Sequence, residues 1–171
     1  TTSALGRHSV EVKIRDAHSL QGPLPEDGAS LLARVPAAQA VSGAQHVAAA
    51  LDAVLAAYAG EADAAHRRER IAAALDILET LATLGLDADA LCAGVLCVPV
   101  AEGCIGAEAL AAGAGAGVAA LIAGVQRMDA LGLDPHEHTR RHSFANRQRQ
   151  GENLRRMLVS MIDDPRVALV K

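Results

Sequence analysis

The spacing of apolar side chains constrains this chain most strongly. Leucine, isoleucine and valine recur every three or four residues through long stretches, which places them on one face of an α-helix. The clearest such helix is predicted between residues 61 and 84, and Gly85 is placed to end it. Its apolar face consists of Ile71, Leu75, Leu78 and Leu81. With one Phe, one Tyr and no Trp in 171 residues, the core must be built from small aliphatic side chains, so we predict an all-α fold.

Two further helices are predicted on either side of this one. Ser42 and Gln45 have the spacing of a capping box before an amphipathic run that ends near Gly60. Asp87 is placed to cap a helix that Pro99 should end or kink, because proline lacks a backbone donor. Other helices are expected at residues 107–110, 117–131 and 150–162.

The two ends of the chain differ from its middle. Residues 1–40 mix polar, glycine and proline positions and are predicted to be an irregular arm, in which SVEVKI alternates like a short strand. Residues 41–171 are predicted to be one helical domain of about six to eight helices. A last helix should start after Asp164 and Pro165. Because that helix has barely begun when the chain stops, we expect a fragment of a longer protein, truncated at the C-terminus.

Composition argues against several classes of protein. The formal net charge is -4 and aromatic residues make up 1%, so the chain lacks the basic surface of a direct nucleic-acid binder. Charged residues interrupt each apolar run before it reaches the roughly 18 residues that a membrane span requires. Three cysteines without a leader segment argue against a secreted disulfide framework. A reducing, cytoplasmic location is therefore predicted.

Three groups of residues carry potential chemistry, and a structural explanation is favoured for each. The histidines at 136, 138 and 142 have metal-ligand spacing, but residues 132–150 are polar and are better explained as an exposed loop. The run HRRER at residues 66–70 is interpreted as a solvated helix face. The cysteines have no CxxC spacing and are predicted to be core residues; they are Cys92, Cys97 and Cys104.

Three blocks of the chain resemble a known family. GENLRRMLVSMIDDPRVALVK resembles the ENxRKMxxAMxxDxRVxLIK segment of the RelA/SpoT family, and GAGVAALIAGVQRMDAL is similar to its FGxSVAxLVxGVxKLxxL block. LGLDADALCAGVL resembles the family's xxLDxxTLxAALLHD run, and the resemblance covers residues 71–171 without gaps. It implies an HD-domain-like helical bundle. In bifunctional members this domain hydrolyses the 3′-pyrophosphate of guanosine tetraphosphate and pentaphosphate with manganese.

The same resemblance implies that the manganese site is lost. Cys97 and Val98 take the positions of the HD pair, and Ala101 and Glu102 take those of a catalytic Glu-Asp pair. The first histidine ligand is replaced by Ala73, and the last ligand would fall just beyond the chain. The family's guanine-binding RSSGEPY loop has no counterpart here. We therefore expect no catalytic residue, no metal ligand and no cofactor in this domain, with these five positions as vestiges.

The function implied is that of a pseudo-hydrolase domain in a RelA-type GTP pyrophosphokinase. The expected partners are the synthetase domain of the same chain, which would use magnesium, ATP and GTP, and the ribosome through C-terminal domains. A homo-oligomer is also compatible with the sequence. Two alternatives stay open: an active manganese phosphohydrolase that uses Cys97, Glu102 and the histidines of residues 136–142, and a helical module that senses nucleotides.

Overall fold

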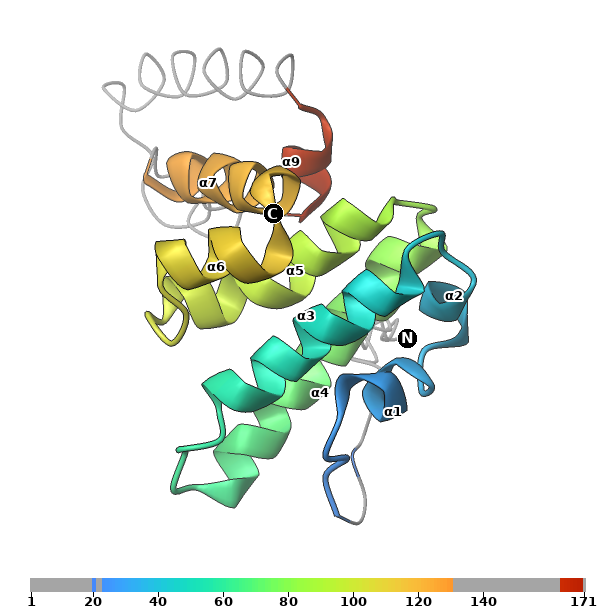
Figure 1. Ribbon diagram of the computed structural model, residues 1–171, viewed down its shortest axis with the longest axis vertical. Coiled ribbons are helices and arrows are strands. Elements are labelled where there is room, and N and C mark those ends of the chain that lie inside the picture. The colour runs from blue at the N-terminus through green and yellow to red at the C-terminus, as the bar shows by residue number, and fades with distance from the viewer. Residues whose placement is uncertain (1–19, 21–22, 131–163, 171) are drawn as a thin grey trace, which may run out of the picture.

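The computed structural model describes residues 20, 23–130 and 164–170. Within these residues the chain forms eight helices and no strand, which confirms the predicted all-α fold (Figure 1). The helices are α1 (Gly28–Leu32), α2 (Pro36–Gln39), α3 (Ala44–Ala57), α4 (Ala64–Thr83), α5 (Ala88–Ala101), α6 (Ala107–Ala114), α7 (Ala116–Ala130) and α9 (Arg166–Val170). None of these described helices is both long enough and apolar enough to cross a bilayer.

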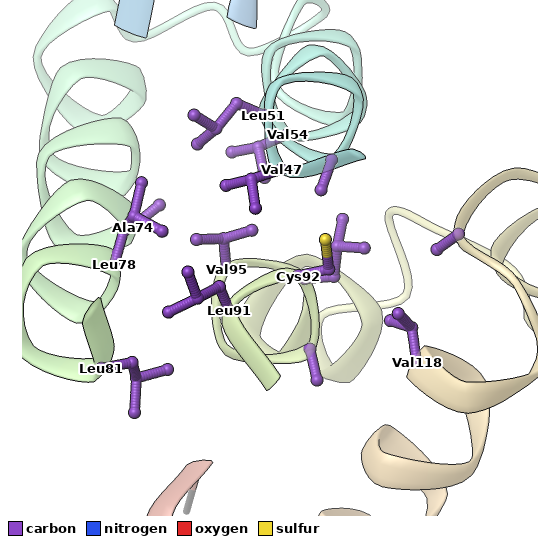
Figure 2. Packing of buried hydrophobic residues seen from close by; sticks show 14 of the residues in the cluster. Val47, Leu51, Val54, Ala74, Leu78, Leu81, Leu91, Cys92, Val95 and Val118 are labelled. Atoms are coloured by element: carbon purple, nitrogen blue, oxygen red, sulfur yellow. The ribbon is translucent and has the colours of Figure 1, made fainter. Parts of the chain in front are cut away.

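Helix α5 lies at the centre of this arrangement. It packs against α3, α4, α7 and α9, and Figure 2 shows side chains of α3, α4 and α7 converging on it. Every residue from Ala90 to Leu96 is buried, because a helix that is apolar on all sides needs such a central position. Gly94 allows a close approach to α4, since a Cβ atom at this position would collide with the side chain of Leu81.

The helix predicted for residues 61–84 is α4. It begins after Asp63, whose carboxylate accepts hydrogen bonds from the backbone nitrogens of Ala65 at 2.8 Å and His66 at 3.4 Å. The four apolar side chains of the predicted face are all buried. Gly85 follows the helix with a φ of +77°, the conformation that makes glycine a good terminator. Periodicity and capping chemistry therefore predicted this element correctly.

The prediction of an irregular arm over residues 1–40 is wrong for residues 28–32 and 36–39, which form α1 and α2. The Asp27 carboxylate caps α1 by accepting a hydrogen bond from the backbone nitrogen of Ser30 at 2.7 Å, and Pro36 begins α2. Helices this short show no clear periodicity in the sequence, yet they belong to the core. Leu31 of α1 and Ala38 of α2 are wholly buried, and so is Val35, which lies between the two helices. The predicted strand SVEVKI lies outside the described residues.

Two predicted helix boundaries also differ. Helix α3 starts at Ala44 after Gly43, which has a φ of +94° and supplies no side-chain cap, so the capping box from Ser42 is wrong. Helix α5 continues past Pro99 and ends at Ala101. Because Pro99 lies in the last turn, its missing donor removes only one helical hydrogen bond and the helix is not broken there.

The start of α9 confirms the predicted role of Asp164. Its Oδ1 accepts a hydrogen bond from the backbone nitrogen of Arg166 at 3.0 Å. The guanidinium of Arg166 also donates from Nη1 to Oδ2 of Asp87 at 2.6 Å. This contact attaches α9 to the beginning of α5, and Val167 is buried next to Gly124 of α7. The predicted loop at residues 132–150, with its three histidines, and the predicted helix at 150–162 lie outside the described residues.

Candidate functional site

The five positions that the family resemblance assigns to a metal site lie on α4 and at the C-terminal end of α5. Cys97 and Val98 are half-buried on α5, and Ala101 is exposed on its last turn. Ala73 lies on the exposed surface of α4, outside the apolar core. Glu102 follows directly after α5, and its side chain is 30% exposed. Glu102 alone among these five carries a charge.

Glu102 is bound by one residue directly after α3 and by one residue on α4. The hydroxyl of Tyr58, just after the end of α3, donates to Oε2 of Glu102 at 2.7 Å. On α4, Nη2 of Arg70 lies 2.5 Å from Oε1. We call Tyr58, Arg70 and Glu102 the Glu102 junction. Burial, and then the hydrogen bond to the carboxylate, raise the pKa of Tyr58 well above its ordinary value, so its hydroxyl remains a donor.

The three cysteines have different surroundings. Cys92 is buried in the core, and this burial, together with the nearby Asp89 carboxylate, raises the pKa of its thiol to about 12. Cys97 is half-buried and packs against the core. Cys104 is exposed, so the prediction of core packing is wrong for this residue. It follows Gly103, whose φ of +75° turns the chain after α5.

The charged run at residues 66–70 is also not simply a solvated face. Arg70 belongs to the Glu102 junction, and Nη1 of Arg68 donates to the backbone carbonyl of Leu20 at 2.8 Å. Both arginine side chains bind other parts of the chain, so the prediction is wrong for these two residues. Their guanidinium groups fasten the first half of α4 to its surroundings.

A family model described as an HD domain matches residues 48–171. The chain belongs to the HD domain family. A GTP pyrophosphokinase of Photobacterium angustum (strain S14 / CCUG 15956) is 35% identical over 98 residues, which is 56% of this chain and 12% of that relative. The chain is thus a RelA/SpoT-type HD domain that spans a small part of the curated relative it matches. No solved structure matches it with significance.

The residues at the vestigial site do not fit a manganese ion. Manganese in proteins prefers carboxylate, carbonyl and water oxygen, with imidazole as the usual nitrogen ligand. Ala73, Ala101 and Val98 offer only hydrocarbon, and Cys97 offers a soft sulfur that is half-buried. The remaining carboxylate, Glu102, already binds a guanidinium and a phenol. Among the residues that the structure describes, no three His, Cys, Asp or Glu side chains come together as a metal-binding group.

The HD domain therefore contains one polar feature at this site that sequence reasoning missed, namely the partners of Glu102. Tyr58 lies 44 residues before Glu102 in the sequence. No local pattern connects residues so far apart. The only hint was that the chain's single tyrosine stands at the end of an amphipathic run, where its hydroxyl needs a partner if the ring is buried.

Proposed function

We propose that this HD domain is a catalytically inactive pseudo-hydrolase domain of a RelA-type GTP pyrophosphokinase. The observation that carries the proposal is the state of Glu102. It is the one carboxylate at the vestigial positions, and it is neutralised by Arg70 at 2.5 Å. A carboxylate engaged in this way is poorly placed to bind a metal ion or to accept a proton from water.

The other vestigial positions support the same proposal. Hydrolysis of a pyrophosphate ester needs a Lewis acid to activate water and to polarise a phosphoryl oxygen. Methyl and isopropyl groups at Ala73, Ala101 and Val98 cannot hold such an ion. The thiol of Cys97 packs partly against the core instead of standing free. The helical fold is thus kept, while apolar residues stand at positions where an active member would need polar metal ligands.

We further propose that the domain regulates a synthetase domain in the same polypeptide. That domain would transfer pyrophosphate from ATP to the 3′-hydroxyl of GTP with magnesium, releasing AMP and forming guanosine pentaphosphate. The relative named as a GTP pyrophosphokinase supports this class of reaction. A packed helical domain can act on a neighbour by contacting its active and inactive arrangements with different free energies. The stringent response, the ribosome and the cytoplasm are the setting expected for such a protein.

The hydrolase half of the proposal is tested by incubating the chain with guanosine tetraphosphate and manganese chloride. We expect no release of pyrophosphate above the rate of the buffer, while the HD domain of a bifunctional family member serves as the positive control. Metal analysis of the purified chain should find less than one manganese ion per molecule. Manganese-dependent turnover by this chain would contradict the proposal.

The regulatory half requires the full-length parent protein. Its rate of guanosine pentaphosphate synthesis is compared with that of a version that lacks this domain. We expect the rate to change, because removal of the domain removes its differential contacts with the synthetase. An unchanged rate, with and without ribosomes, would show that the domain has no regulatory role.

A further inference from the structure

The Glu102 junction lies where the ends of two helices meet the start of a third. Tyr58 is the first residue after α3, and Glu102 is the first residue after α5. Arg70 lies in the second turn of α4. The C-terminus of a helix carries a partial negative charge equivalent to about half an elementary charge. Two such ends and the Glu102 carboxylate therefore bring negative charge together at one place.

Arg70 supplies a full positive charge at this place, in addition to the partial positive charge at the start of α4. Its guanidinium contacts Oε1 of Glu102, and the two side chains are 35% and 30% exposed, so water screens the pair only in part. The Nε of Arg70 is buried and has no hydrogen-bond partner among the described residues. A donor left unsatisfied is unfavourable by itself. The ion pair with Glu102 therefore holds the guanidinium in place, although not all of its N–H groups have hydrogen-bond partners.

We infer that Arg70 is an internal counter-cation that latches the end of α3, the start of α4 and the end of α5 together. In this position it fixes two connecting segments at once, residues 58–63 and residues 102–106. Backbone hydrogen bonds at the start of each segment can be followed by amide hydrogen exchange. The amide of Tyr58 donates to the carbonyl of Val54 at 3.3 Å, and the amide of Glu102 donates to the carbonyl of Val98 at 2.9 Å. The inference concerns the fold and holds whether or not the domain regulates a synthetase.

Hydrogen exchange and thermal unfolding of the chain test this latch. In Arg70→Ala, Glu102 loses its counter-charge, and we expect the melting temperature to fall by about 3 °C. Exchange of amides in residues 58–63 and 102–106 should speed up by about tenfold, while the core segment at residues 74–81 stays protected. Arg34→Ala is the matched control, because Arg34 is an exposed arginine between α1 and α2. It should leave both segments unchanged.

The double variant Arg70→Met with Glu102→Gln separates the latch from general destabilisation. It removes both charges, while Met keeps an unbranched apolar stem in place of that of Arg and Gln has the shape of Glu. We therefore expect it to recover at least half of the lost melting temperature, since no uncompensated charge remains. Recovery supports the latch, also in the case that Arg70→Ala does not fold. A double variant as impaired as Arg70→Ala overturns it. Exchange that rises equally in all segments, or no more than in Arg34→Ala, overturns it as well.

Discussion

The two halves of α5 differ in how deeply they are buried and in what they contact. From Ala90 to Leu96 each residue is buried, whereas from Cys97 to Ala101 most residues are half-buried or exposed, and Glu102, directly after the helix, forms an ion pair with Arg70 of α4. The first half stabilises the domain through apolar packing on all sides. In the proposed function, the second half corresponds to the positions where active members of the family would hold a metal ion. If the proposed function holds, one helix carries both the packing core and the former site, in separate segments.

Under the proposed function, this separation explains how the fold persists when the hydrolase chemistry is lost. Burying a large aliphatic side chain contributes about 1.5–3 kcal/mol, and the first half of α5 gains this contribution without any metal ion. An unpaired charge in the second half would be costly. Cys97 and Val98 avoid that cost, and Glu102 is offset by Arg70. The loss of ligands that we propose would thus leave the stabilising segment unchanged.

The strongest contrast between the two regions is expected in thiol labelling. Cys92 in the first half has a pKa of about 12 because it is buried, so at pH 8 its thiolate is roughly a thousandfold rarer than for an ordinary thiol. Cys104, just beyond the second half, is exposed. A thiol-reactive reagent should therefore modify Cys104 first and Cys92 only after unfolding. Peptide mapping by mass spectrometry measures both rates, and rapid modification of Cys92 in the folded chain would contradict the assigned packing.

A core truncation is expected to have the next largest effect. Leu91→Ala removes a wholly buried side chain and should lower the free energy of unfolding by about 3 kcal/mol. Val98→Ala, in the half-buried second half, should lower it by less than about 1 kcal/mol. Urea denaturation followed by circular dichroism measures both values. Equal losses would show that the two halves do not differ in their contribution to stability.

The smallest effect is expected at the first residue before α5. Asp87 accepts a hydrogen bond from the backbone nitrogen of Ala90 at 3.0 Å and contacts Arg166. Asp87→Ala should lower the free energy of unfolding by about 1 kcal/mol, because the cap is lost. Asp87→Asn keeps the cap and loses only a partly exposed ion pair. This variant should lower the free energy of unfolding by only a few tenths of a kcal/mol. If both variants lose the same amount, the ion pair with α9 outweighs the cap.

Local features of the sequence predicted much of this fold. Asp87 and Gly85 marked helix ends correctly because capping and terminating chemistry acts over a few residues. The apolar face of α4 followed from the helical period alone. Pro99 does not end α5 as the sequence predicts, since a proline in the last turn of a helix removes only one hydrogen bond.

The Glu102 junction could not be predicted in this way. Arg70 lies on α4, while Tyr58 and Glu102 directly follow α3 and α5, and their pairing depends on how these three helices pack. A charged run such as HRRER reads as solvated unless the partner of each arginine is known. The five vestigial positions were assigned from family resemblance, and the structure adds that Glu102 has partners of its own.

The tyrosine of the Glu102 junction has one more consequence. The chain contains a single Tyr and no Trp, so Tyr58 alone dominates its ultraviolet fluorescence. A carboxylate that accepts a hydrogen bond from a phenol quenches the emission of that ring, and here the acceptor is Glu102 at 2.7 Å. The brightness of the whole domain therefore reports whether these helix ends are joined, without any added label.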